Sequence, residues 1–288
     1  MVTGRGRGLT GALLPGLALA ALLALAACGV TNAPAPASSD RPAVTPRTSA
    51  ASPVASTRPR PVRHVRLPLS GKTIVIDPGH NGQNWAHPEI INRLVNVITE
   101  WKACDTTGTA TVSGYAEHAF NFDVATRLAR LLRHEGAKVV LTRANDTGVG
   151  PCVTERAAIG NRAHAQAAIS IHADGGPVSG SGFEVIEPGL IPGHNGIIIR
   201  PSQLLALDIR NAYHRITGES YSDYVGHDGL DVRTDLGGLN LSTVPKVFIE
   251  CGNMPNPGDA AKLMSAAFRQ RIAVALAAGF TAFLAPGR

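Results

Sequence analysis

The sequence predicts an α/β fold with a single mixed, mostly parallel sheet and helices on both faces. Three observations lead to this class. From about residue 68, short apolar runs typical of buried strands alternate with segments of helical periodicity. Three of these runs stop abruptly at polar residues and glycine, which break a strand. No internal repeat or separate binding module is visible, so we place one folded domain at residues 68–288.

The amino terminus has the features of an export signal. Arg5 and Arg7 precede an apolar run over residues 13–27 that is short for a membrane span. The run ends at Cys28 in the sequence Leu-Ala-Ala-Cys, which resembles the bacterial lipobox. We expect residues 1–28 to direct export to the cell envelope, in the periplasm or on the outer face of the plasma membrane. Cys28 is a candidate lipidation site, and ordinary signal cleavage nearby is the alternative.

Residues 29–67 form a stretch rich in Pro, Ala, Ser, Thr and Arg, which predicts a disordered linker. Most of the net charge of +6 lies before the folded domain, which is therefore nearly neutral. The basic composition does not predict nucleic-acid binding. It suits a tether beside an anionic membrane or wall polymer, or a linker that only adds solubility. We expect a monomer that meets a membrane only through the candidate lipid anchor.

The first strand of the domain is predicted over residues 73–76. It ends in Asp77-Pro78-Gly79-His80, where Pro and Gly force a turn. His80 is thus presented at the carboxyl end of a strand, where ligand sites of α/β folds usually lie. Residues 81–115 are predicted to be a long loop with one apolar stretch, and long loops are often functional.

The clearest helix is predicted over residues 117–135, because apolar residues recur there at three- and four-residue spacing and Gly136 follows. Glu117 lies four residues before Asn121, on the face that should pack on the sheet. Its carboxylate would then point inward. The alternative interpretation is an acidic residue that favours the amino end of a helix.

The remaining elements are predicted in alternation. They are strand 138–141, helix 154–166, strand 168–171, strand 183–186, loop 187–200, helix 203–216, loop 218–243, strand 245–249 and a single long helix 259–284. His172 follows the third strand and Glu250 follows the last one. If these strands are parallel neighbours of the first, His80, His172, Glu250 and Glu117 meet at one edge of the sheet.

Two imidazoles and one carboxylate are a usual ligand set for catalytic zinc. A second carboxylate could carry the proton from a water molecule to a leaving amine. The spacing alone does not decide which of Glu117 and Glu250 is the ligand. Among the other histidines, His118 is the nearest rival as a ligand.

Three cysteines remain after Cys28. Cys104 and Cys152 both lie in predicted loops, and an exported protein meets an oxidising compartment, so we predict a disulfide between them. Cys251 follows an apolar strand and is predicted to be buried and free. None of the three has the C-x-x-C spacing of a zinc knuckle.

Taken in order, four blocks resemble the zinc-dependent N-acetylmuramoyl-L-alanine amidases of the amidase_3 family. The blocks are D-P-G-H at residues 77–80, Glu117 and Asn121 with G-A-K-V-V-L-T-R at 136–143, S-I-H-A at 170–173, and P-K-V-F-I-E-C-G at 245–252 with N-P-G-D at 256–259. The resemblance implies that His80, Glu117 and His172 bind Zn²⁺ and that Glu250 is the general base. It implies hydrolysis of the amide between N-acetylmuramic acid and L-alanine of peptidoglycan stem peptides, in wall remodelling or turnover.

Asn240, Cys251 and Asn253 depart from the family pattern, and we expect them to tune contacts with the substrate. Two other functions stay open at this point. One is a zinc peptidase that cuts within the stem peptide, and the other is a non-catalytic wall-binding protein. A generic α/β domain with coincidental polar strand ends would not explain four ordered blocks.

Overall fold

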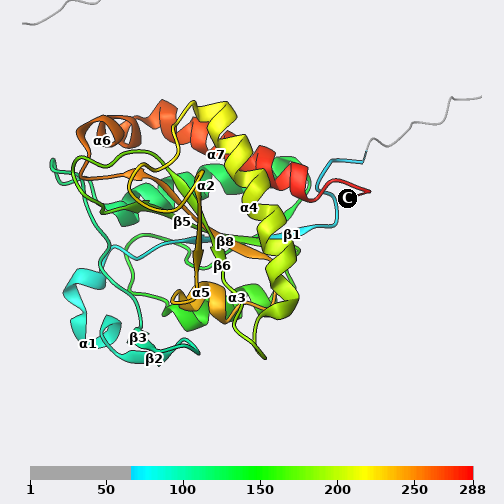
Figure 1. Cartoon of the computed structure of the whole chain (residues 1–288), viewed down its shortest axis with the longest axis horizontal. Helices are drawn as coiled ribbons and strands as arrows, with labels where there is room; N and C mark the ends of the chain where they lie inside the picture. The colour runs from blue at the N-terminus through cyan, green and yellow to red at the C-terminus, as the bar shows by residue number, and fades with distance from the viewer. Residues whose placement is uncertain (1–65, 288) are drawn as a thin grey trace, which may run out of the picture. The chain divides into compact units, whose positions relative to one another are not determined.

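The computed structural model describes residues 66–287 (Figure 1). The predicted signal segment, the candidate lipidation site Cys28 and nearly all of the predicted linker lie outside the described residues. Within the described part, no helix has both the length and the apolar character needed to cross a membrane.

Six strands form the main sheet in the order β4-β1-β5-β8-β6-β7. Their bounds are β1 Thr73–Pro78, β4 Lys138–Leu141, β5 Ala167–Asp174, β6 Glu184–Pro188, β7 Leu230–Arg233 and β8 Lys246–Asn253. Every neighbouring pair is parallel except β6 and β8, which are antiparallel. The predicted mixed, mostly parallel sheet is confirmed.

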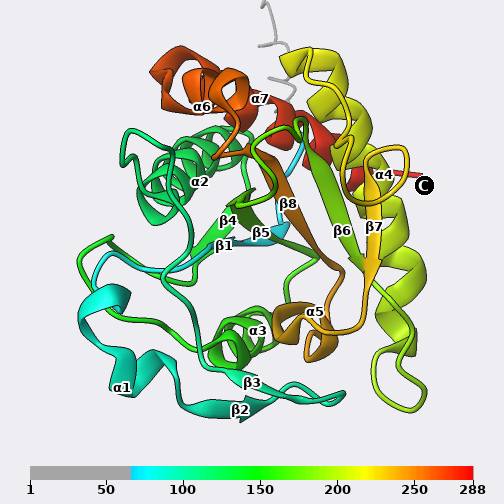
Figure 2. The ribbon, with the colours of Figure 1, turned by 60° about the vertical axis from the view of Figure 1, so that its left-hand side comes forward.

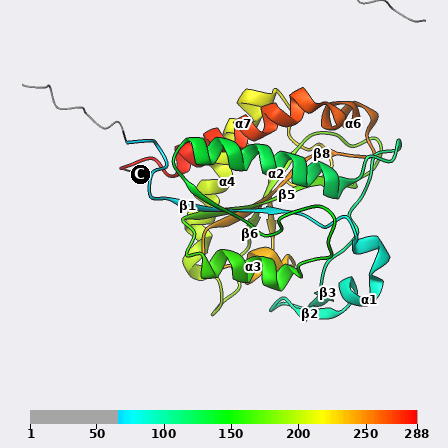
Figure 3. The same cartoon turned by 180° about the vertical axis from the view of Figure 1, so that it is seen from behind.

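Helices cover both faces of this sheet, as predicted. One face carries α2 (Glu117–His134), α4 (Gly196–Thr217), α6 (Pro257–Met264) and α7 (Ala266–Phe283) (Figure 3). The other face carries α3 (Val153–Arg162) and the short α5 (Gly237–Asn240). The larger hydrophobic core lies between the sheet and the first group, where α7 contacts both α2 and α4.

Residues 81–115 are more structured than the predicted loop. They contain a 3-10 turn η1 (Asn84–Ala86), a short helix α1 (Pro88–Ile91), and the antiparallel hairpin of β2 (Leu94–Asn96) and β3 (Trp101–Ala103). This segment lies on the same side of the sheet as α3 and α5 (Figure 2). The predicted disulfide between Cys104 and Cys152 is present and joins the end of β3 to the start of α3. Cys251 is buried and free, as predicted.

Several predicted boundaries are wrong. Helix α3 stops at Arg162, before the predicted residue 166, because His164 adopts a left-handed backbone with φ 45°. Ser265 divides the predicted carboxyl-terminal helix into α6 and α7, with extended backbone and a side chain that accepts from the Phe268 amide. Helix α4 begins at Gly196, inside the predicted loop 187–200. The predicted loop 218–243 contains β7 and α5.

Strands β5 and β8 run past their predicted ends and include His172 and Glu250. The two residues lie directly opposite each other in the parallel register. The parallel pairing of β5 and β8 therefore continues through His172 and Glu250, although the apolar pattern predicted that each strand ends just before these residues.

Candidate active site

The fold brings the predicted site residues together. Strands β1, β5 and β8 are adjacent, so the turn after β1 places His80 beside His172 and Glu250. Glu117 is the first residue of α2, which packs on this part of the sheet. The candidate ligand atoms of His80, Glu117 and His172 all lie within 4.8 Å of one another.

Glu117 contacts both imidazoles. Its Oε2 lies 3.1 Å from Nε2 of His80, and its Oε1 lies 2.9 Å from Nδ1 of His172. Burial alone would raise the pKa of Glu117, but His80 and His172 hold it well below its ordinary value. Burial would lower the pKa of His80, yet Glu117 and Asp105 raise it to about 10. The Glu117 carboxylate and the His80 imidazole therefore stabilise each other's charged forms.

The second ring nitrogen of His80 is also held in place. Nδ1 lies 3.1 Å from the carbonyl oxygen of Thr106 and 3.4 Å from Oδ1 of Asp105. Such outer contacts fix the orientation of a metal-binding imidazole and the nitrogen it presents. The sequence does not predict Asp105 as part of the site, because this residue lies in an irregular stretch without a recognisable motif.

Arg156 links Asp105 to the base of the site. All five of its N–H groups are used, since its donors reach Pro151 O, Asp77 Oδ1, Pro78 O, His80 O and Asp105 Oδ2. The Arg156 side chain is 4% exposed, and Asp77 and Asp105 are 2% and 5% exposed. The guanidinium thus fixes the turn that presents His80 and the loop that supports it.

Asp77 is a fully bonded buried carboxylate. It accepts from Thr142 and Ser170 hydroxyls at 2.6 Å, from Arg156 at 2.9 Å and from Lys246 at 3.0 Å. Burial alone would raise its pKa, but Lys246 and Arg156 hold it far below the ordinary value. Asp77 therefore stays ionised and links β1 to β5, β8, α3 and the residue that follows β4, beneath the site.

Two glycines allow the site to close tightly. A Cβ on Gly79 would lie 2.1 Å from Cε1 of His172. Gly108 has φ +76°, and a Cβ there would lie 2.6 Å from His80 Cδ2 and 2.7 Å from Glu117 Oε2. Side chains at these positions would displace the histidines or the carboxylate.

Glu250 lines the same cavity as the three candidate ligands, and this cavity has a volume of about 290 Å³. Its Oε2 atom is buried and has no hydrogen-bond partner within the described part of the chain. Burial, followed by the nearby Glu117, Glu184 and Asp174 carboxylates, raises the pKa of Glu250 well above its ordinary value. A carboxyl group with these properties is suited to accept and return a proton.

His118 is not part of the cluster. Its Nδ1 lies 2.7 Å from Oδ2 of Asp146, away from the three candidate ligands. Asn240 is buried, and its amide donates to Val97 O and Thr234 O.

Cys251 and Asn253 are buried as well, and Asn253 donates to the carbonyls of Pro177 and Gly180. The amides of Asn240 and Asn253 thus hold backbone carbonyls around the site. That Asn240, Cys251 and Asn253 tune contacts with the substrate stays a prediction.

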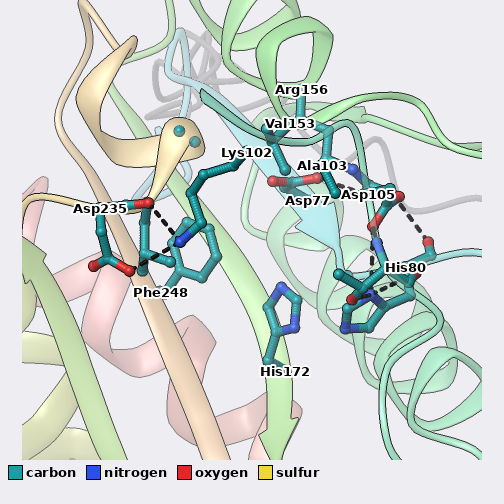
Figure 4. A pocket seen from close by; sticks show the side chains of 15 residues that line it. Asp77, His80, Lys102, Ala103, Asp105, Val153, Arg156, His172, Asp235 and Phe248 are labelled. Carbon is teal, nitrogen blue, oxygen red and sulfur yellow. Dashed lines mark hydrogen bonds and ion pairs between the residues drawn. The ribbon is translucent and has the colours of Figure 1, made fainter. Parts of the chain in front are cut away.

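A second cavity of about 210 Å³ adjoins the first (Figure 4). The two share the lining residues His80, Thr106, His172, Leu236 and Phe248. The His172 ring stacks on Phe248 with centroids 5.3 Å apart. The β2–β3 hairpin, α3 and the start of α5 supply most of the remaining walls.

The fold and site define an α/β domain with a candidate His-Glu-His metal cluster and an adjacent carboxyl group at one edge of its sheet. Residues 74–282 match the Amidase_3 family, described as N-acetylmuramoyl-L-alanine amidase, and the chain belongs to this family.

Among curated proteins, the chain is 42% identical over 217 residues to N-acetylmuramoyl-L-alanine amidase Rv3717 of Mycobacterium tuberculosis. That match covers 75% of this chain and 88% of the relative. Among solved structures, the N-acetylmuramyl-L-alanine amidase Ami1 of Mycobacterium smegmatis is 40% identical with a TM-score of 0.71, covering 75% of this chain and 98% of that one. Ami1 of Mycobacterium abscessus is 38% identical with the same TM-score and covers 75% and 100%.

Proposed function

We propose that this protein is a zinc-dependent N-acetylmuramoyl-L-alanine amidase. In this proposal it hydrolyses the amide that joins the lactyl group of N-acetylmuramic acid to L-alanine of the peptidoglycan stem peptide. The observation that carries the proposal is the His80–Glu117–His172 cluster, with Glu250 lining the same cavity. Family membership and the 42% identity to a curated amidase support the choice of substrate.

The residues present fit zinc. Two imidazole nitrogens and one carboxylate match a catalytic zinc site, which keeps a position open for water or substrate. Both oxygens of Glu117 already face histidine nitrogens, and the surroundings of His80 fix its ring. When bound, zinc supplies a Lewis acid that polarises a carbonyl and lowers the pKa of a water molecule.

Glu250 is the general base in this proposal. Its unpartnered Oε2 is free to take a proton from the attacking water and to pass it to the nitrogen of the leaving alanine. A carboxyl group whose pKa is raised holds that proton until the leaving nitrogen takes it up. Glu117 cannot take this role while both of its oxygens are engaged at the ligand cluster.

The setting of the reaction is also part of the proposal. A peptidoglycan substrate lies outside the cytoplasm, which agrees with the export that the amino-terminal segment predicts. We propose a role in wall remodelling or turnover at the cell envelope. The lipid anchor at Cys28 is a proposal of the same kind, tested by mass spectrometry of the amino-terminal residue.

The variant Glu250→Gln tests the assignment of the base. It should bind zinc as the unchanged protein does, while kcat on a muramyl peptide falls by about 10²- to 10⁴-fold. Glu89→Gln, at an exposed carboxylate, is the control and should leave both quantities unchanged. Full turnover by Glu250→Gln would remove Glu250 from the mechanism.

A further inference from the structure

The second cavity, beside the candidate metal site, has walls that offer little to a polar ligand. Ala103, Val153, Leu236 and Phe248 form much of its lining. The buried charged groups of its lining are Asp77, Asp105 and Arg156. The donors of Arg156 are all used within the protein, and both oxygens of Asp105 already accept hydrogen bonds. A polar group placed deep in this cavity would lose its hydration without gaining a partner, so the interior favours an apolar group.

The partly exposed Lys102 side chain offers a donor at the mouth of the cavity. Nζ of Lys102 donates to the backbone oxygen and to Oδ2 of Asp235, both at 3.0 Å (Figure 4). An ammonium group has three N–H bonds, so one remains for a ligand. Glu100 lies 4.0 Å away, beyond hydrogen-bond distance, and is exposed. The cavity therefore combines an apolar interior with a donor at the mouth, which suits a methyl group attached to a carbonyl.

The position of Glu250 decides which half of the substrate faces this cavity. Glu250 lines the metal cavity and is not among the residues that line the second one. The leaving nitrogen must lie within reach of Glu250 to receive its proton. The peptide half of the substrate then occupies the metal cavity. The acyl half, which bears the sugar, extends past His80 and His172 toward the second cavity.

We propose that the second cavity binds the N-acyl group on the muramic acid sugar, an inference that rests on the proposed amidase function. The methyl group of the N-acetyl substituent fills the space against Ala103 and Val153. Its carbonyl oxygen accepts the remaining N–H of Lys102. The two interactions would fix the sugar while the lactyl carbonyl lies at the metal cluster.

The test compares two synthetic muramyl dipeptides that differ by one methyl group, the N-acetyl compound and its N-formyl analogue. The zinc-loaded full chain should cleave the N-acetyl compound with a kcat/KM about tenfold higher, the effect of one buried methyl group. Ala103→Leu fills the cavity and should bring this ratio close to one. Ala110→Leu makes the same change at an exposed position of the same segment and should keep the ratio.

Val153→Leu narrows the cavity beside Ala103, because Val153 N donates to Cys104 O. It serves as a second variant if circular dichroism shows that Ala103→Leu does not fold. Lys102→Met should lower kcat/KM for both compounds by a similar factor and leave their ratio unchanged. The conservative variant Lys102→Arg should recover part of that loss.

The outcomes separate the two proposals. If the unchanged protein cleaves neither compound, the proposed function fails. If it cleaves both, and the ratio is the same with and without the Ala103→Leu change, the N-acyl assignment is overturned. A third substrate, with glycine in place of L-alanine, tests whether the second cavity binds the alanine side chain instead of the N-acyl group. If Ala103→Leu removes the preference for alanine over glycine but not for acetyl over formyl, the cavity holds the alanine side chain and the proposal is wrong.

Discussion

Glu184 and Glu250 lie directly opposite each other on the antiparallel strands β6 and β8. Within residues 66–287, each buries an Oε2 atom that has no hydrogen-bond partner. Burial, with Asp174 and Asp231 nearby, raises the pKa of Glu184 to about 8. The candidate general base therefore has a protonated carboxylic acid as its neighbour in the sheet at neutral pH, and this limits the negative charge around the site.

The raised pKa of Glu184 predicts a pH-dependent stability. The unfolded chain releases this proton near pH 4.5, while the folded protein retains it until about pH 8. The stabilising contribution is therefore complete below about pH 4.5 and is lost as the pH rises to about 8. Glu184→Gln has no carboxyl proton to lose. Between pH 5 and pH 8 the unfolding free energy of the variant should therefore rise relative to that of the unchanged protein by about a few kcal/mol.

Urea unfolding of both metal-free proteins at pH 5 and pH 8 measures this difference. Glu155→Gln, at an exposed position, is the control. The assignment of a protonated Glu184 would be contradicted if the free energies of unfolding of Glu184→Gln and the unchanged protein differed by the same amount at both pH values.

The three-residue cluster predicts which histidines bind zinc. His80→Ala and His172→Ala should each weaken zinc binding by more than about a hundredfold, because each removes one of three ligands. His118→Ala should bind as tightly as the unchanged protein, since His118 contacts Asp146 instead. Isothermal titration calorimetry against a competing chelator gives the three affinities. Loss of binding only in His118→Ala would show that the ligand set is wrong.

Helix α3 contains two arginines, and replacing Arg156 should lower the free energy of unfolding more than replacing Arg162. Arg156→Met leaves Asp77 and Asp105 buried without their guanidinium partner, and we expect a loss of about 3–5 kcal/mol in the free energy of unfolding. Arg162→Met, on the same helix, removes only an exposed ion pair with Glu155 and should cost less than about 1 kcal/mol. If chemical denaturation showed that Arg156→Met and Arg162→Met lose the same free energy of unfolding, the buried network around Arg156 would contribute little to stability.

The sequence was sufficient to predict the sheet, the disulfide and the meeting of His80, Glu117, His172 and Glu250. Strand ends and one helix face carry these residues, and short-range patterns predict both features. The supporting network could not be predicted. Asp105 and Arg156 are separated by 51 residues, and their contact depends on how residues 81–115 pack on α3.

The second cavity was missed for the same reason. Its walls come from the hairpin, α3 and the start of α5, and no local pattern predicts how these segments pack. The contacts of Asn240 were equally beyond prediction. Its amide donates to the backbone oxygen of Val97, 143 residues away in the sequence, and no local pattern connects the two.

The most direct test of the account is mass spectrometry of N-acetylmuramyl-L-alanyl peptides after incubation with the protein, with chelator, and with zinc restored. We predict release of a free stem peptide that begins with L-alanine, loss of this product with the chelator, and its return with zinc. A cut inside the stem peptide would place the enzyme among the peptidases. Cleavage that is unaffected by the chelator, or no cleavage by the zinc-loaded protein, would contradict the proposed zinc amidase.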